Sequence, residues 1–192
     1  MRIGVLSLQG DFAEHVQAFE ELGVEVSAVK RPEAVLACDA LVLPGGESTT
    51  IGKLCVRFGV GEAILDLARR GAPIWGTCAG MILLAREIEE SDQWRLGLMD
   101  ITVRRNAFGR QVESFEADLE IAGVPEGPLR TVFIRAPVIT RIGPQVEVLA
   151  SVEDKIVAAR EGQYLATAFH PELTTDRRVE QFFLRMLEQS NG

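Results

Sequence analysis

The first half of the chain alternates short apolar runs with segments whose apolar residues recur at helical spacing. The apolar runs are predicted strands: 3–8, 24–29 and 40–43. Between the first two runs, apolar residues recur at helical spacing from Phe12 to Leu22, which predicts a helix that Asp11 caps and Gly23 ends. Alternating strands and helices are typical of a parallel α/β sheet, and nearly continuous apolar strands indicate that helices cover both of its faces.

The second half of the chain changes to short strands joined by turns that contain glycine and proline. The elements predicted there are strands over 101–104, 111–121, 130–134, 145–152, 155–160 and 164–169, and a helix over 176–189. No linker or repeat separates the two halves. We therefore expect a single domain over residues 1–192, with a three-layer α/β architecture in which antiparallel strands extend one side of a mostly parallel central sheet.

A sharp turn follows another short apolar run, residues 73–75. Residues 76–80 read Gly-Thr-Cys-Ala-Gly, and the apolar residues 81–85 continue as a predicted helix of roughly three turns. A Gly-x-Cys-x-Gly turn between a strand and a helix has the form of a nucleophile elbow, with Cys78 in the place of serine. Glycine at both flanks permits a turn too sharp for a Cβ atom, and the helix N-terminus favours the thiolate. The alternative is a structural buried cysteine beside a tight turn.

A cysteine nucleophile requires a base, and the chain has two histidines. His170 follows the predicted strand 164–169, and the carboxylate of Glu172 lies where it can orient the imidazole. Cys78, His170 and Glu172 together satisfy the logic of a catalytic triad, whereas the alternative is a loop that faces solvent. His15 borders the apolar face of the first helix, where we expect it to pack structurally or to contact a neighbour rather than to act as the base.

A glycine-rich loop, Pro-Gly-Gly-Glu-Ser-Thr-Thr over residues 44–50, follows the third predicted strand. Ligands of parallel sheets usually bind at the carboxyl ends of strands, and a loop without side chains lets backbone N–H groups approach them. The alternative is a plain loop in which Ser48 or Thr49 caps the next helix. Cys55 lies on the apolar face of that helix and is expected in the core, and we interpret Cys38 as structural too.

Composition narrows the classes of function. The net charge of −8, with no long basic patch, argues against general binding to nucleic acid or to anionic membranes. No apolar run reaches the ~18 residues of a membrane span, and the N-terminal stretch lacks the features of a signal peptide. The three cysteines include no CxxC pair, which is typical of a reduced cytoplasmic protein without a disulfide framework or zinc site.

The elbow and the later His-Pro-Glu of residues 170–172 resemble the triad, or class I, glutamine amidotransferases. Further stretches are similar to one branch of that superfamily, the PdxT family of glutaminase subunits of pyridoxal 5′-phosphate synthase. They are Leu8-Gln9-Gly10-Asp11 with His15, and the stretches 43–50, 105–111 (Arg-Asn-Ala-Phe-Gly-Arg-Gln), 133–137 (Phe-Ile-Arg-Ala-Pro) and 169–173 (Phe-His-Pro-Glu-Leu). They span almost the whole chain, and the resemblance implies a flavodoxin-like, class I glutamine amidotransferase-like α/β fold.

The resemblance implies hydrolysis of L-glutamine to L-glutamate and ammonia. Cys78 would attack the side-chain amide and form a glutamyl thioester, His170 would move the protons, and Glu172 would orient His170. Backbone N–H groups of Gly46 and Ala79 would form the oxyanion hole.

The same resemblance assigns glutamine binding to residues that offer cations, N–H groups and acceptors. They are Gly46, Glu47, Ser48, Arg105, Ile134 and Arg135. On composition alone, Arg104, Arg105 and Arg110 would form a solvated basic loop, and only the family match reverses that interpretation. Gln9 and the turn after it are expected near the same pocket or against a partner.

The implied partner is the synthase subunit, PdxS, a ring-forming protein that uses the ammonia to make pyridoxal 5′-phosphate within a large hetero-oligomeric complex. The resemblance implies no cofactor and no metal in the glutaminase itself, and a cytoplasmic location.

Three alternatives remain open at this point. The chain could be the glutaminase subunit of another amidotransferase, against which the stretch 105–111 argues. It could be a non-catalytic binding module with the same fold, which the intact Cys78, His170 and Glu172 disfavour. It could also be a cysteine peptidase or chaperone-like relative with the same elbow, which turnover of glutamine would exclude.

Overall fold

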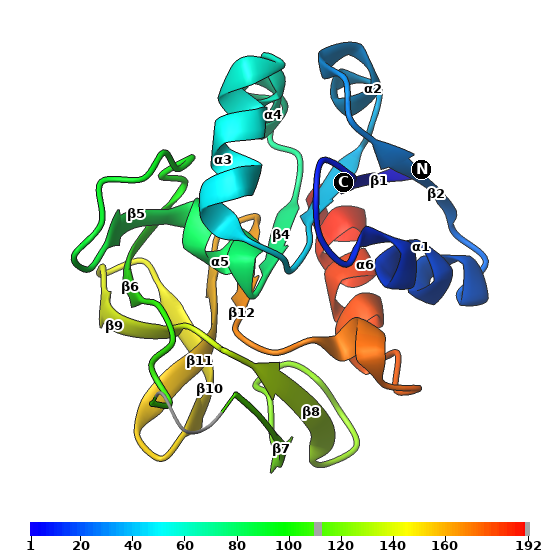
Figure 1. Ribbon diagram of the computed structural model, residues 1–192. Coiled ribbons are helices and arrows are strands. Elements are labelled where there is room, and N and C mark those ends of the chain that lie inside the picture. The colour runs from blue at the N-terminus through cyan, green and yellow to red at the C-terminus, as the bar shows by residue number, and fades with distance from the viewer. Residues whose placement is uncertain (110–112, 191–192) are drawn as a thin grey trace.

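The structure is a computed structural model that describes residues 1–109 and 113–190 of the chain. Most of its strands form one 10-stranded sheet. One half of this sheet is parallel, in the order β2-β1-β3-β4-β12 (Figure 1). These strands are β1 (Arg2–Leu6), β2 (Glu25–Val29), β3 (Ala40–Leu43), β4 (Ile74–Thr77) and β12 (Tyr164–Thr167). The order is that of flavodoxin-like folds, so the expected α/β architecture is confirmed.

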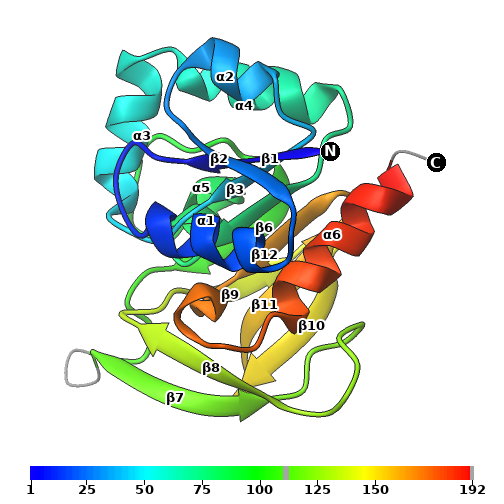
Figure 2. The same cartoon turned by 90° about the vertical axis from the view of Figure 1, so that its right-hand side faces the viewer.

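Helices cover both faces of the parallel half, as the apolar strands predict. The helices are α1 (Phe12–Glu21), α2 (Pro32–Leu36), α3 (Ser48–Arg57), α4 (Val60–Arg69), α5 (Ala79–Leu84) and α6 (Arg178–Ser190). In Figure 2, α2 and α4 lie above β1 and β2, whereas α1 lies below them. The helices α1 and α6 lie side by side in both views (Figures 1 and 2).

A buried aromatic cluster joins α1 and α6 to the middle of the sheet. Phe19 of α1 and Phe183 of α6 both pack against Trp75 of β4, with ring centroids 6.4 and 5.5 Å apart. The indole N–H of Trp75 donates a hydrogen bond to Thr167 Oγ1 in β12 at 3.0 Å, so the buried polar atom of this large side chain has a partner. Strands β4 and β12 are therefore fixed to each other by side chains as well as by their backbone ladder.

Antiparallel strands continue the sheet beyond β12. They are β11 (Lys155–Glu161) next to β12, then β9 (Val138–Ile142) and β6 (Met99–Arg104), with β10 (Glu147–Val152) paired to β11. The strand β5 (Ala85–Ile88) lies at the far edge and pairs with β6 in parallel. The predicted extension of one side of the sheet is confirmed. The strand predicted over 164–169 was expected among these antiparallel strands, but it is β12, which pairs with β4 in parallel because it follows the same direction at the middle of the sheet. However, β7 (Ser114–Leu119) and β8 (Leu129–Ile134) form a separate two-stranded sheet, which lies at the bottom of Figure 1.

The segment after the sharp turn differs from the prediction. The helix α5 ends at Leu84, after six residues rather than roughly three turns. Ala85 is extended, at φ −62° and ψ 143°, and it begins β5, which pairs with β6 in parallel. The residues of β5 include strong helix formers, so tertiary strand pairing overrides their propensity here.

Other boundaries shift by a few residues, and β9, like β5, was not predicted as a strand. The closing helix α6 begins at Arg178 rather than at residue 176, because the Asp176 side chain lies before the helix and accepts a hydrogen bond from the Arg178 backbone N–H at 3.1 Å. The strand predicted over 111–121 is observed as β7, from Ser114 to Leu119, and the first two residues of the prediction, 111 and 112, lie outside the described residues. The sequence of β9, Val-Ile-Thr-Arg-Ile, is rich in β-branched residues and indicates a strand, although no strand was predicted there.

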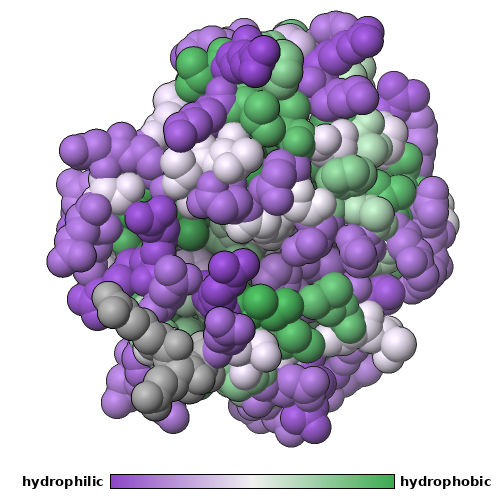
Figure 3. Space-filling view, in the orientation of Figure 1, coloured by the Kyte–Doolittle hydropathy of each residue, from purple (hydrophilic) through white to green (hydrophobic). Residues whose placement is uncertain are grey.

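Within residues 1–109 and 113–190, no helix combines the length and the apolar character needed to cross a membrane. The face seen in Figure 3 is mostly hydrophilic, with smaller apolar areas between the charged side chains.

Candidate active site

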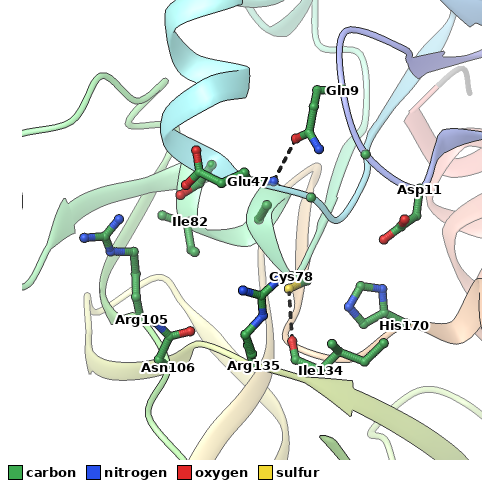
Figure 4. A pocket seen from close by; sticks show the side chains of 14 residues that line it. Gln9, Asp11, Glu47, Cys78, Ile82, Arg105, Asn106, Ile134, Arg135 and His170 are labelled. Carbon is green, nitrogen blue, oxygen red and sulfur yellow. Dashed lines mark hydrogen bonds between the residues drawn. The ribbon is translucent and has the colours of Figure 1, made fainter. Parts of the chain in front are cut away.

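The carboxyl ends of β1, β3, β4 and β12 meet at one edge of the sheet, and each is followed by residues that the sequence singles out. A cavity of about 350 Å³ opens there (Figure 4). Every predicted site residue except Glu172 lines it: Gly46, Glu47, Ser48, Cys78, Ala79, Arg105, Ile134, Arg135 and His170. Gln9, Gly10 and Asp11 line it too, as do Ile82 and Asn106, for which no role was predicted.

Cys78 lies between β4 and α5 in the conformation of a nucleophile elbow. Its φ of 49° and ψ of −103° are unfavourable for a residue with a Cβ atom, so the surrounding structure must hold it there. The flanking glycines are required by close packing. A Cβ atom on Gly76 would overlap the backbone of Gly80, and one on Gly80 would overlap the carbonyl oxygen of Leu43. The turn predicted around Cys78 is therefore present.

The Cys78 thiol is nearly buried, with 8% of the residue exposed. Its Sγ donates a weak hydrogen bond to the carbonyl oxygen of Ile134, 3.8 Å away (Figure 4). The other two cysteines are also buried. Burial raises the pKa of the Cys55 thiol to about 12, which fits the predicted place in the core, and the Cys38 Sγ donates to the carbonyl oxygen of Ala34.

His170 and Glu172 form a buried hydrogen-bonded pair. His170 follows β12, and Glu172 lies in a short 3-10 helix, η1 (Pro171–Leu173), which turns the carboxylate back onto the imidazole. The Nδ1 of His170 lies 2.7 Å from Glu172 Oε1. Because a carboxylate only accepts hydrogen bonds, Nδ1 carries the proton and Nε2 is left without a partner among the described residues. The pair has the geometry of a base and its orienting acid.

The electrostatics of the pair favour an imidazolium beside a carboxylate. Burial opposes the charged imidazole, but the adjacent Cys78 and Glu172 outweigh it and raise the pKa of His170 to about 10. Burial likewise opposes the charged carboxylate, but His15 and His170 hold the pKa of Glu172 below its ordinary value. His170 can therefore hold a proton taken from the thiol.

The structure places His15 against this pair. Its Nε2 lies 3.1 Å from Thr77 Oγ1 and 3.3 Å from Glu172 Oε2, and the side chain is fully buried. The sequence allowed for a contact with a neighbour but could not identify that neighbour. No local signal reveals it, because α1 and η1 are far apart in the chain.

The glycine-rich loop is fixed from two sides. The Glu47 carboxylate caps α3 by accepting from the backbone N–H groups of Thr49 at 3.3 Å and Thr50 at 2.7 Å, so the proposed capping by Ser48 or Thr49 was wrong. The Glu47 N–H donates to Gln9 Oε1 at 2.8 Å (Figure 4). The loop therefore has a defined conformation in this structure, with Gly46 at φ 145°.

Gln93 is a polar residue of the site that was not predicted from the sequence. Its Oε1 accepts hydrogen bonds from Ser48 Oγ at 3.3 Å, Thr49 Oγ1 at 3.1 Å and Arg105 Nη1 at 3.0 Å. It thus links the glycine-rich loop to the arginine across the cavity. Arg104, in contrast, points away and pairs with Glu89 at 2.6 Å on the surface.

Arg110 and Gln111, which belong to the family-like stretch 105–111, lie outside the described residues. The remaining polar groups of the cavity have complementary charges. Arg105 and Arg135 offer guanidinium groups, and Glu47 and Asp11 offer carboxylates (Figure 4). Such a set suits a small zwitterion with both an anionic and a cationic end.

One group of potential metal ligands is present in the described part of the chain. Asp11, His170 and Glu172 each bring one candidate ligand atom to within 4.8 Å of the others. His170 and Glu172 already bind each other through a hydrogen bond. The sequence-based expectation that the site holds no metal stays a prediction.

Comparison with known proteins identifies relatives over nearly the full chain. The model of the SNO glutamine amidotransferase family matches residues 5–189. The pyridoxal 5′-phosphate synthase subunit PdxT of Moorella thermoacetica is 57% identical, with 97% of this chain and 100% of the relative covered. The subunit PdxT of Pelotomaculum thermopropionicum is 59% identical, with 96% and 94% covered.

Solved structures agree with this match. One described as a glutamine amidotransferase superposes with a TM-score of 0.92 at 49% identity, covering 97% of this chain and 98% of the other. A structure described as PurLQS from Thermotoga maritima reaches a TM-score of 0.72 at 20% identity, covering 97% of this chain and 98% of the other. The second likeness supports the fold alone.

Proposed function

Because this chain belongs to the SNO glutamine amidotransferase family, we propose that Cys78, His170 and Glu172 hydrolyse the side-chain amide of L-glutamine. The protein is the glutaminase subunit of pyridoxal 5′-phosphate synthase, in agreement with the name of its relatives. The observation that carries the proposed chemistry is the strained Cys78 elbow beside the buried pair of His170 and Glu172, in one cavity.

The reaction begins with a proton transfer from the Cys78 thiol to Nε2 of His170. This requires the S–H of Cys78 to turn from the Ile134 carbonyl oxygen towards the imidazole of His170, which lines the same cavity. The thiolate then attacks the amide carbon of glutamine and forms a tetrahedral intermediate. Glu172 stabilises the imidazolium that forms on His170.

The intermediate collapses when His170 gives its proton to the leaving nitrogen, which departs as ammonia and leaves a glutamyl thioester on Cys78. A water molecule then gives a proton to His170 and attacks the thioester carbonyl, and the proton returns to the sulfur as glutamate leaves. Backbone N–H groups of Gly46 and Ala79 stabilise the oxyanion in both steps, and losing one such donor generally costs about 3 kcal/mol.

Substrate binding uses the complementary charges of the cavity. Arg105 and Arg135 attract the α-carboxylate, while Glu47 and the carbonyl of Ile134 accept from the α-ammonium. Gly46 and Ser48 complete the site from the glycine-rich loop.

Several finer points belong to the same proposal. Ammonia passes to a synthase subunit within a large hetero-oligomeric complex in the cytoplasm, and no nucleic acid or membrane takes part. The whole chain, residues 1–192, acts as a single domain. The glutaminase itself uses no cofactor.

The proposal is tested by measuring glutamate release from L-glutamine, for the chain alone and with the synthase subunit. We expect turnover that rises when the synthase subunit is present, and we expect Cys78→Ala to abolish it. Cys38→Ala is the matched control, since Cys38 lies away from the cavity. Absence of turnover in both mixtures would reject the glutaminase interpretation in favour of a binding module.

A further inference from the structure

Both oxygens of the Glu172 carboxylate face an imidazole. Oε1 is bound by His170, as described above, whereas Oε2 is buried and makes no hydrogen bond of standard geometry within the described residues. The Nε2 of His15 lies 3.3 Å from Oε2. A buried carboxylate oxygen without a donor is costly, so the contact with His15 is the one that offsets this cost.

The tautomer of His15 follows from its surroundings. If Nε2 were unprotonated, its lone pair would face the Glu172 carboxylate, which would repel it. Nε2 therefore carries the proton. It lies within hydrogen-bond geometry of Thr77 Oγ1 and 3.3 Å from Glu172 Oε2. Burial keeps the ring neutral, since it lowers the pKa of His15 despite the opposing effect of Glu172. Nδ1 is left without a partner among the described residues.

The contact also links the strand that carries Cys78 to the carboxylate that orients His170. Thr77 immediately precedes Cys78, and its backbone lies at the end of β4, beside β12. By touching Thr77 and Glu172 together, His15 fixes the orienting carboxylate relative to the strand that carries the nucleophile. Neither His170 nor the backbone ladder constrains Oε2 in this way.

We propose that His15 is a positioning residue for glutamine hydrolysis, whose Nε2–H holds Oε2 of Glu172 and so keeps that carboxylate aligned with His170. This rests on the proposed function, in which Glu172 stabilises the protonated base. Without His15, the buried Glu172 would rotate or take up a proton, and the imidazolium would lose its counter-charge.

The test compares two amide substitutions that differ only in reach. The amide nitrogen of glutamine falls close to the position of Nε2 in histidine, whereas that of asparagine falls close to Nδ1. His15→Gln therefore restores a donor towards Glu172, and His15→Asn does not. Both variants place an amide in the same buried site, so their melting temperatures control for structural damage.

Two readouts are measured for each variant. The first is kcat and KM for glutamine in the presence of the synthase subunit. The second is the pH profile of Cys78 alkylation by iodoacetamide, on the chain alone. The ionisable groups that face this site are His170, Glu172, Asp11 and Glu14 around His15, and Glu180 of α6 behind Glu172. Cys78 and His170 form the reacting pair.

We expect His15→Asn to lower kcat by roughly 10- to 100-fold with KM near that of the wild type, and His15→Gln to stay within about threefold. The alkylation profile of His15→Asn should move to higher pH, because a less available carboxylate makes the imidazolium less favourable. The profile of His15→Gln should not move.

The proposal is overturned if His15→Asn keeps the wild-type kcat and profile, or if both variants lose activity equally with lower melting temperatures and unmoved profiles. Failure of the proposed function would look different, as a wild-type chain that releases no glutamate with the synthase subunit. The alkylation profile needs no turnover, so it decides the role of His15 in that case too.

Discussion

Glu180 is a buried residue whose ionisation the fold does not accommodate. It is fully buried on the first turn of α6, and neither of its carboxylate oxygens has a hydrogen-bond partner among the described residues. The nearest cation, Arg177 Nη1, is 3.9 Å away, and the same guanidinium also binds Glu21. Burial is the main cause that raises the pKa of Glu180 to about 7, and the charge of Glu172 adds to it.

The sign of the resulting pH dependence follows from linkage. Between the ordinary value of 4.5 and about 7, the folded chain keeps a proton on Glu180 that the unfolded chain has released. This group therefore makes the free energy of unfolding fall as pH rises through that window. We expect the wild type to lose about 2 to 3 kcal/mol relative to Glu180→Gln between pH 5 and pH 8.

Chemical denaturation of the two proteins at several pH values checks this prediction. Glu188→Gln, an exposed position on the same helix, is the matched control and should follow the wild type. Parallel curves for wild type and Glu180→Gln would show that Glu180 ionises normally in the folded state.

At the scale of elements, the loop between β5 and β6 connects two parts of the proposed substrate site, a role that its sequence does not predict. Gln93 in this loop binds both Ser48 at the start of α3 and Arg105 after β6. Removing it frees a guanidinium and a hydroxyl that the proposed substrate site uses. We expect Gln93→Leu to raise KM for glutamine about three- to tenfold with a smaller change in kcat, since it affects ground-state binding.

Steady-state kinetics with the synthase subunit test this expectation. Asp92→Ala, at the exposed neighbouring position, should leave both constants unchanged. A fall in kcat at unchanged KM would contradict a role in holding the substrate site.

The contact between α5 and β3 explains why the turn after β4 requires glycine. In most helices, replacing glycine by alanine is favourable, by about 1 kcal/mol. At Gly80 the added Cβ would meet the Leu43 carbonyl oxygen, and backbone cannot move aside as a side chain can. We expect Gly80→Ala to lower the free energy of unfolding by about 2 to 4 kcal/mol and to abolish glutamine turnover.

Denaturant titration and the glutaminase assay measure both effects. Gly71→Ala is a useful comparison, because a Cβ there meets no atom within 4 Å and only the positive φ of 86° opposes it. A Gly80→Ala protein as stable as Gly71→Ala would refute the packing argument.

Over the whole molecule, the parallel α/β architecture and the position of the site were predictable from the sequence. The strand order was not, because β12, expected among the antiparallel strands, pairs in parallel with β4. Alternating apolar runs predicted the parallel half of the sheet, and the carboxyl ends of its strands predicted where Cys78, His170 and the glycine-rich loop would meet. What the sequence could not supply are contacts between distant segments. The approach of His15 to Glu172, the bridge made by Gln93, and the extended conformation of β5 each depend on packing partners that local patterns do not encode.

The place of β12 in the sheet has a consequence for when the site forms during synthesis of the chain. Strand β12 pairs with β4 although Leu165 and its partner Trp75 are far apart in the chain. During translation the ribosome releases the cysteine turn long before the segment with the histidine, and contacts of such sequence separation form late. The growing polypeptide thus carries Cys78 without its proposed base, His170, until synthesis is almost finished. Under the proposed mechanism, a nascent or prematurely terminated chain that lacks His170 does not hydrolyse glutamine.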